Sequence, residues 1–579
     1  MSFKEYKTLD LIKVSDHISS FWKVDKTFEK SISSRDKKEF IFYEGPPSAN
    51  GMPGIHHVMA RAIKDIFCRY KTLKGFKVNR KAGWDTHGLP IELGVEKELN
   101  ISKEDIGSKI SIKDYNEACK KAVMKYTDVW NNLTERIGYW VDMENPYITY
   151  KSKYIESVWW LLKNLHDKKL IYKGYSVQPY SPKAGTGLSS HELNQPGTYQ
   201  DITDTTVTAQ FECLEESIPN FLKKYSKIYI LAWTTTPWTL PSNTALTVGE
   251  KIEYCLIKTY NLYTHQPINV VLAKELITKV FKTNFKEVSK QDELIFNNDK
   301  EIPYIVVETF LGKDIVGMKY HQIWDDSPLP NDSPENAFRL ISGDFVTTED
   351  GTGIVHTAPT FGADDAIAAK NAKPEVPPML IKNKNGDLVP LVDLQGKFVK
   401  ELGFLGGKFV KNEYYEKGKA PERSVDVEIA IKLKEENKAF RVEKYTHSYP
   451  NCWRTDKPIL YYPLNSWFIK VTEKREELIA LNNKINWKPK STGEGRFGNW
   501  LNNANDWNLS RSRFWGIPLP IWVSEDGSEK KVIGSVKQLI EEINHSVSSG
   551  NMKKNPFEDF ELGNTVSYTH LRAHETRFY

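Results

Sequence analysis

The sequence has few of the features that mark secreted or membrane proteins. Its 579 residues contain only 5 cysteines, and none of these is paired at C-x-x-C spacing. This excludes a disulfide framework and indicates a reducing compartment. No stretch approaches the roughly 20 consecutive apolar residues that a membrane-spanning helix needs. The N-terminal stretch MSFKEYKTLDLIKVSDHISS is charged and lacks the apolar centre of a secretory signal. We therefore predict a cytoplasmic protein with no membrane association.

Net charge is small as well. The chain has 80 Lys and Arg against 75 Asp and Glu, which gives a formal charge of +5. This balance permits a polyanionic partner but does not argue for one. The chain is too long for one ordinary domain, and its length predicts about two to four domains.

The first part of the chain predicts a strand, a glycine-rich turn and a helix. Residues 39–43, EFIFY, are rich in aromatic and apolar side chains and predict a short buried strand. After the turn, Ala60, Ile63, Phe67 and Tyr70 follow helical spacing and predict one apolar stripe that faces a core. A second strand is predicted in KVNRKAGWDTHGLPIE. Such a unit begins a doubly wound α/β fold.

The character of the sequence changes near residue 185. The stretches YQDITDTTVTAQFEC, SKIYILAWTTTPWTL and GTGIVHTAPTFGADD are rich in threonine and in strand-forming residues, and they predict a separate barrel-like domain. A helical pattern returns in RSVDVEIAIKLKEENKAF, and the chain becomes rich in tryptophan and turns from about Glu443. This order predicts a β-rich domain inserted into an α/β domain.

The predicted turn, GPPSANGMPGIHH, ends in two adjacent histidines, His56 and His57. The N-terminus of a helix presents free N–H groups and the positive end of the helix dipole, and phosphates bind there. Histidines on the first turn can add donors to a triphosphate whose charge shifts as a bond breaks. A pair of surface histidines at a helix start explains these two residues alone equally well.

Four motifs, two of them in two parts, follow one another along the chain in the order found in the class I aminoacyl-tRNA synthetases, which they resemble. They are PPSANGMPGIHH with GWDTHGLPIE, then WTTTPWTLPSN, then GTGIVHTAP, and finally EGRFGNWL with DWNLSRSRFWG. The resemblance runs from near residue 1 to about residue 563, and GWDTHGLPIE is the form of the isoleucine-specific branch. It implies a Rossmann-like catalytic domain in two parts, residues 1–185 and 411–565. A β-rich editing domain over residues 186–410 would interrupt it.

The resemblance implies a monomeric ligase that activates isoleucine with ATP and Mg²⁺ and transfers it to tRNA(Ile). We expect this chain to be a fragment of such a ligase, truncated before the K-M-S-K-S loop. The ATP-binding motif of the family, H-x-G-H, falls on residues 54–57, so Gly54 replaces the first histidine and His56 replaces the usual glycine. We interpret this as a variant in which His56 takes the role of the first histidine. The residues expected to bind ATP are Pro47, Gly54, His56 and His57, and those expected to be catalytic are His56, His57 and Asp85.

The resemblance also implies an apolar pocket for the amino acid. In it, Asp85 binds the substrate ammonium, His87 meets the adenylate or orients the loop, and Pro46 and Trp515 form walls. From the residues alone, a loop-capping role for Asp85 is the simpler interpretation. A structural role for His87 is equally compatible with the sequence.

A pocket shaped for isoleucine cannot strongly exclude valine, which lacks only one methylene. The resemblance therefore implies a second, hydrolytic site. Thr234, Thr235 and Thr236 would hold the terminal adenosine and a water molecule. Asp365 would hold the ammonium of the misplaced amino acid, and His356 would orient the 3′ end or the water. Without the family, an ordinary β-strand explains the threonines and a helix N-terminus explains Asp365.

No metal site is predicted in this chain. Relatives often carry two C-x-x-C pairs, and the matching positions here are Ser181, Ala184, Cys452 and Thr455. One thiolate cannot form a four-thiolate zinc site. Residues 566–579 match nothing in the family and show no apolar periodicity, so we expect a foreign tail, in which His570 and His574 lack partner ligands at suitable spacing.

Two alternatives stay open. The first is a valine or leucine enzyme of the same class, against which GWDTHGLPIE argues. The second is a fragment that edits or binds tRNA without charging it. The family's second ATP motif, K-M-S-K-S, and a W-F-D-S-G element do not occur in these 579 residues. Isoleucine-dependent pyrophosphate exchange separates the ligase from this second alternative.

Overall fold

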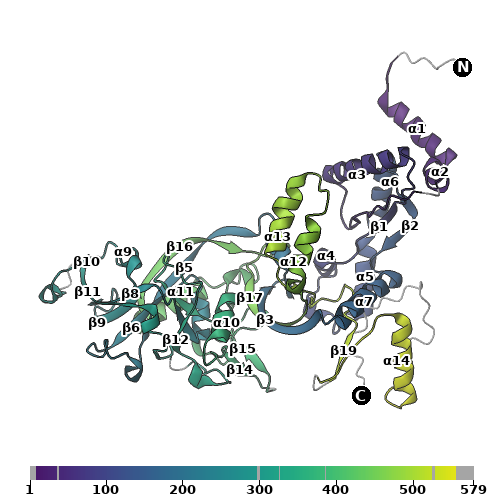
Figure 1. Cartoon of the computed structure of the whole chain (residues 1–579). Helices are drawn as coiled ribbons and strands as arrows, with labels where there is room; N and C mark the ends of the chain where they lie inside the picture. The colour runs from purple at the N-terminus through teal and green to yellow at the C-terminus, as the bar shows by residue number, and fades with distance from the viewer. Residues whose placement is uncertain are drawn as a thin grey trace. The chain divides into compact units, whose positions relative to one another are not determined.

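A computed structural model describes residues 8–35, 38–296, 300–324, 327–384, 386–524 and 528–555. It divides into two compact units. The first combines the chain up to Tyr172 with the chain from Arg513, and the second is Lys173–Ser512. The predicted tail over residues 566–579, with His570 and His574, lies outside the described residues. Figure 1 shows the helices and strands under the labels used below.

The first unit consists mainly of helices with a small parallel pair of strands. β1 and β2 run parallel, with Gly83 opposite Tyr147, and the helices between them form the crossover that a parallel pair requires. A short hairpin, β19 with β20, and a final helix close the unit. The bounds are α1 Leu11–Asp25, α2 Thr27–Ser33, α3 Ile55–Leu73, β1 Lys81–Trp84, α4 Leu89–Leu99, α5 Ile112–Val123, α6 Thr127–Arg136, β2 Asp142–Ile148, α7 Ser152–Asp167, β19 Ile521–Val523, β20 Lys530–Val532 and α14 Val536–Ser548.

The predicted strand at residues 39–43 is not formed. Only an isolated parallel bridge joins Glu39 to Lys77, supported by the backbone N–H of Phe40, which donates to the Lys77 carbonyl at 2.9 Å. Ile41 and Tyr43 are 72% and 88% exposed. The prediction failed because apolar composition indicates a preference for strand but does not provide a neighbouring strand to pair with.

The predicted helix after the turn is confirmed as α3, but its apolar stripe faces the other way. Ile63, Phe67 and Tyr70 are 56%, 54% and 55% exposed. The buried residues of this helix are Arg61, Cys68 and Thr72. Spacing identifies which residues share a face, but it does not say which face another element covers. The stripe prediction is therefore wrong about burial.

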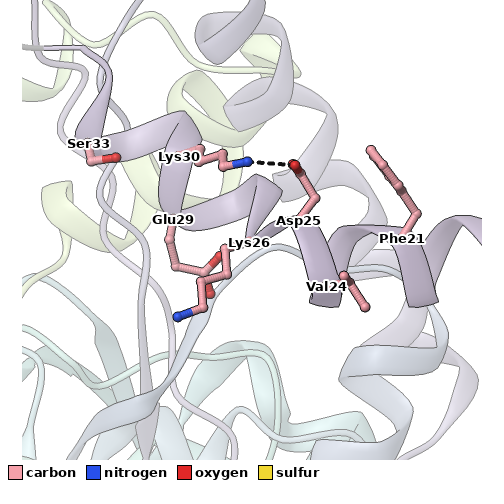
Figure 2. A pocket seen from close by; sticks show the side chains of 7 residues that line it. All are labelled: Phe21, Val24, Asp25, Lys26, Glu29, Lys30 and Ser33. Carbon is pink, nitrogen blue, oxygen red and sulfur yellow. Dashed lines mark hydrogen bonds and ion pairs between the residues drawn. The ribbon is translucent and has the colours of Figure 1, made fainter.

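The first two helices meet at Lys26, whose φ of 52° lets the chain turn between them. Between α1 and α2 lies a cavity of about 600 Å³. Figure 2 shows the ion pair at its rim, where Lys30 Nζ lies 2.6 Å from an Asp25 carboxylate oxygen. The cavity contains none of the site residues predicted from the sequence. Its lining residues are Phe21, Val24, Asp25, Lys26, Glu29, Lys30 and Ser33.

The second unit is built around a large mixed sheet. Its main path runs β10-β11-β8-β9-β6-β13-β7-β12, and β5 pairs with β6 on one edge and β16 on the other. The long antiparallel pair of β5 and β16 is visible in Figure 1. The bounds of these strands are β5 Tyr199–Glu212, β6 Ile228–Thr234, β7 Ala245–Val248, β8 Glu253–Tyr260, β9 Pro267–Ala273, β10 Phe285–Glu287, β11 Ile302–Leu311, β12 Arg339–Ser342, β13 Ile354–Thr357 and β16 Ala439–Pro450.

Smaller elements complete the second unit. A four-stranded sheet has the order β18-β17-β3-β4, and β14 pairs with β15. The central strands β6, β8 and β9 supply many of the fully buried side chains of a single large core. The bounds are β3 Ile171–Ser181, β4 Thr186–Gly187, α8 Ser190–Leu193, α9 Ile277–Val280, α10 Ala363–Asn371, β14 Leu380–Lys382, β15 Leu388–Pro390, α11 Val425–Glu435, β17 Leu460–Ile469, α12 Arg475–Asn482, α13 Gly498–Asn502 and β18 Trp507–Asn508. In the part of the chain that the structure describes, no helix has both the length and the apolar character needed to cross a membrane.

Candidate functional site

The turn before α3 is held in place by residues far along the chain. The backbone N–H of Asp85 donates to the Pro47 carbonyl at 2.9 Å. The indole N–H of Trp130 donates to the Gly51 carbonyl, also at 2.9 Å. Pro46 and Pro47 are half-buried between these anchor points. The turn is thus fixed beside the end of β1, where Asp85 lies.

His57 caps the start of α3. Its Nδ1 accepts the backbone N–H of Gly54 at 2.9 Å, and its ring lies 3.8 Å from the His56 ring and 4.6 Å from Trp130. Burial lowers the pKa of His57, and the nearby His56 and Arg61 lower it further. Because Nδ1 is an acceptor, the neutral ring carries its proton on Nε2. His57 therefore offers one N–H donor beyond those of the helix backbone.

The His56 ring lies close to Gly54. A Cβ atom at position 54 would lie 2.8 Å from His56 Cε1 and 2.9 Å from its Nδ1. A side chain at position 54 and the His56 ring therefore compete for the same space. With the His56 ring in this orientation, glycine at position 54 fits without any movement of that ring.

Asp85 follows directly after β1, and His87 lies two residues later. Asp85 is exposed, yet the protein around its carboxyl group raises its pKa by desolvation, while the backbone N–H of His87 partly opposes this shift. Burial lowers the pKa of His87 to about 4, so its ring is neutral at pH 7. His87 Nε2 is buried without a hydrogen-bond partner in the described part of the chain. A buried polar atom of this kind is suited to a polar ligand atom.

Trp515 packs against the segment that follows β1 and contains Asp85 and His87. It is 3% exposed, its indole N–H donates to the Thr86 carbonyl at 2.6 Å, and its ring lies 5.4 Å from His87. Its backbone N–H donates to Glu92, which is itself paired with Arg513 at 3.0 Å. The structure thus places Trp515 in contact with the residues that follow Asp85. Whether it also forms a pocket wall remains a prediction.

The predicted threonine residues lie where β6 ends and a short 3-10 helix, η3 (Pro237–Ser242), begins. We call residues Thr234–Thr239 the threonine loop. The backbone N–H of Thr236 donates to Thr234 Oγ1 at 3.1 Å, and the Thr239 hydroxyl donates to the Thr236 carbonyl at 2.8 Å. Thr234 is buried, and Thr235 and Thr236 are half-buried. Thr235 and Thr236 are therefore the more accessible residues.

His356 belongs to a chain of hydrogen bonds that fixes its protonation. Asn243 Nδ2 donates to the Ala245 carbonyl at 2.8 Å, which identifies this atom as the amide nitrogen, and it also donates to His356 Nδ1 at 2.8 Å. His356 Nε2 therefore carries the proton and donates to Thr239 Oγ1 at 3.0 Å. The Tyr320 hydroxyl donates to Asn243 Oδ1 at 2.7 Å. Burial lowers the pKa of His356 to about 3, so the ring is neutral.

Asp365 lies on the first turn of α10, close to the end of β13. One carboxylate oxygen accepts the backbone N–H of Ala358 at 2.8 Å. Burial raises the pKa of Asp365 to about 6, the Ala358 hydrogen bond opposes this shift, and Asp364 adds to it. β6 and β13 are parallel neighbours, with Trp233 opposite Val355, so their carboxyl ends meet at one edge. The structure thus brings the threonine loop, His356 and Asp365 together.

Sequence reasoning missed several residues of these sites. Thr239 belongs to the same threonine-rich stretch, WTTTPWTLPSN, so the sequence could have indicated it. Asn243 and Tyr320 hold His356, and the buried Arg61 lies 4.9 Å from the Trp130 ring, beside His57. Asp426 accepts the backbone N–H of Trp238 from a distant helix. No local pattern in the sequence signals these contacts, because each joins segments that are far apart along the chain.

Comparison with known proteins gives a consistent result. The family model described as "tRNA synthetases class I (I, L, M and V)" matches residues 17–570. The isoleucine–tRNA ligase of Cytophaga hutchinsonii is 58% identical over 95% of this chain and 49% of that protein. The ligase of the same name from Bacteroides fragilis is 56% identical over 96% of this chain and 49% of its own length. That of Clostridium tetani is 42% identical over 93% and 46%. The chain thus spans about half the length of the curated relatives it matches.

Proposed function

Because the chain belongs to the class I tRNA synthetases of the isoleucine, leucine, methionine and valine group, we propose that it serves isoleucine–tRNA ligation. In this proposal it activates isoleucine with ATP, transfers the acyl group to tRNA(Ile) and hydrolyses Val-tRNA(Ile). The observation that carries the proposal is the 54–58% identity to isoleucine–tRNA ligases over about 95% of the chain. The protein acts as a monomer in the cytoplasm.

The first site activates the amino acid. ATP phosphates bind at the N-terminus of α3, which has free backbone N–H groups and where His57 caps the first turn through its Nδ1. Mg²⁺ accompanies the ATP as its counter-ion. The carboxylate of Asp85 pairs with the isoleucine ammonium, and His87, with its buried Nε2, donates to or accepts from a polar atom of the adenylate. Catalysis here is orientation and charge stabilisation, and it needs no covalent intermediate on the protein.

The second site removes valine. Asp365 pairs with the ammonium of the misplaced amino acid, and the hydroxyls of Thr235 and Thr236 bind the terminal adenosine and the attacking water. His356 cannot act as a general base at neutral pH, because its Nδ1 accepts a hydrogen bond from Asn243 and its Nε2–H is donated to Thr239. It acts instead as a fixed donor that positions Thr239.

Two assays on the 579-residue chain test this proposal. Isoleucine-dependent pyrophosphate exchange reports activation, with valine as the comparison substrate. Deacylation of Val-tRNA(Ile), with Ile-tRNA(Ile) as the control, reports editing. Exchange with isoleucine together with selective loss of valine supports both sites. Deacylation without exchange would limit the function to editing, and the absence of both activities would contradict the proposal.

A further inference from the structure

The helix η3 begins without a cap of its own. Thr236 at the N-cap position makes no side-chain hydrogen bond to the helix backbone, and Pro237 has no N–H. The next donor, the backbone N–H of Trp238, donates to Asp426 Oδ1 at 2.9 Å. The backbone N–H of Thr239 donates to the Thr236 carbonyl at 2.9 Å. The cap of this helix therefore comes from a residue 188 positions away.

Asp426 is the second residue of α11 and is 3% exposed. A buried carboxylate needs compensation, and here it receives two kinds. One oxygen accepts the Trp238 amide, and the other lies 3.7 Å from Lys411 Nζ. Burial raises the pKa of Asp426 to about 6, and Lys411 opposes this shift most strongly. Lys411 thus favours the ionised form of the Asp426 carboxyl group, and this form is the stronger acceptor for the Trp238 amide N–H.

Lys411 is itself held in a closed arrangement. It is 6% exposed, and its Nζ lies 2.9 Å from Asp204 Oδ2 and 4.9 Å from the centre of the Tyr449 ring. His447 Nε2 lies 3.3 Å from the same oxygen of Asp204. These groups come from β5, β16 and the segment before α11. A rigid set of this kind holds Asp426 in one orientation.

We propose that Asp426 is a positioning residue for the threonine loop and that Lys411 holds it in place. By fixing the amide of Trp238, Asp426 sets the start of η3 between Thr236 and Thr239. Thr236 is tied back to Thr234, and Thr239 accepts from His356. A shift of Trp238 therefore moves the hydroxyls on both sides of it. The catalytic part of this inference depends on the proposed editing function, whereas the structural part does not.

The test uses three variants of the full 579-residue chain. Asp426→Ser leaves a hydroxyl beside Lys411 that is too short to reach the Trp238 amide. Asp426→Asn keeps an oxygen at the same distance, which can still accept that amide. Glu428→Gln is the matched control, because Glu428 lies on the same helix and its carboxylate pairs with Lys408 at 2.6 Å.

Two readouts are compared. Hydrogen exchange of the amides at 238–240 is expected to quicken by about tenfold or more in Asp426→Ser, and to stay within about threefold in Asp426→Asn and in Glu428→Gln. For Val-tRNA(Ile) deacylation, kcat is expected to fall by about tenfold or more in Asp426→Ser while KM stays within about threefold, because the substrate contacts remain but their geometry loosens. Asp426→Asn should restore most of the kcat.

The outcomes separate this inference from the proposed function. If the wild-type chain does not deacylate Val-tRNA(Ile), the proposed editing function fails, and hydrogen exchange of the amides at 238–240 still decides the role of Asp426. Unchanged hydrogen exchange of the amides at 238–240 in Asp426→Ser overturns the inference, whatever the deacylation activity of that variant. Loss of protection in β8 and β9 as well would show that Asp426 supports the whole unit rather than the loop, and would also overturn it.

Discussion

Replacing Asp365 by asparagine should stabilise the second unit while it removes editing. The side chain accepts the Ala358 N–H and lies in a site where burial raises its pKa from 3.8 to about 6. A carboxyl group whose pKa is raised on folding binds its proton more tightly in the native state. Its ionisation therefore opposes folding, and stability falls as pH rises from about 4 to about 6. Asparagine keeps the acceptor oxygen and never ionises.

The size of the effect follows from the shift. One pKa unit corresponds to about 1.4 kcal/mol. The rise from 3.8 to about 6 therefore predicts that Asp365→Asn increases the free energy of unfolding of the second unit by about 3 kcal/mol at pH 7. At pH 5, where the native carboxyl is mostly protonated already, the gain should be about half of that. These figures are upper limits, since Asp365 is only partly buried by surface area.

Native-state hydrogen exchange in β8 and β9 measures the unfolding free energy of this unit alone, because both strands lie in its core. The variant is compared with wild type at pH 5 and pH 7, so that the titration of His356 and other groups cancels. Asp364→Asn is the control: Asp364 is the exposed neighbour on the same helix turn, and its loss should cost only about 0.5 kcal/mol. A variant at Asp365 that is less stable than wild type, or a gain that does not depend on pH, would refute the reasoning.

Three further predictions concern the first unit and the metal content. Asp85→Ala should lower isoleucine-dependent pyrophosphate exchange by about a hundredfold or more, because the substrate ammonium loses its partner, and exchange within about threefold of wild type would contradict the assignment. Gly54→His should destabilise the start of α3 because its side chain meets the His56 ring, and adding His56→Gly should restore most of the loss. A double-mutant cycle should give a coupling of about 1–2 kcal/mol, whereas additive effects would show that the two positions are independent. Metal analysis of the purified chain should find no stoichiometric zinc, since Ser181, Ala184 and Thr455 replace three of the four thiolates, and one zinc per chain would disprove this.

The α/β fold class and the family were predictable from the sequence, and the family match confirms both. α3 was predictable because a turn and a 3.6-residue period define it locally. The exposure of Ile63, Phe67 and Tyr70 was not, because burial depends on which other elements pack against a helix. The strand at residues 39–43 was predicted wrongly for a similar reason: pairing requires a partner that composition does not reveal.

The residues of the candidate editing site also fall into two groups, those that the sequence indicates and those that it does not. Thr234, Thr235, Thr236, His356 and Asp365 came from family motifs, and the structure brings them to one edge of the sheet. The residues that hold them in place had no such signal. Tyr320 meets Asn243 across 77 positions, and Asp426 meets Trp238 across 188. Contacts of this separation arise from sheet order and helix packing, so they are visible only in the folded chain. The roles of all these residues remain predictions.

The outward stripe of α3 has a consequence for how the protein behaves in solution. Its exposed apolar members form a band along one helix face: Ile55, Met59, Ile63, Ile66, Phe67, Tyr70 and Leu73. A continuous apolar band of this kind favours association between molecules at high protein concentration. Sulfate and phosphate strengthen association that is driven by apolar surface. The same salts would weaken association that is driven by attraction between opposite charges, because ions screen it. Self-association of this chain should therefore increase with sulfate concentration, and replacing Phe67 with a charged residue should raise the concentration at which light scattering begins.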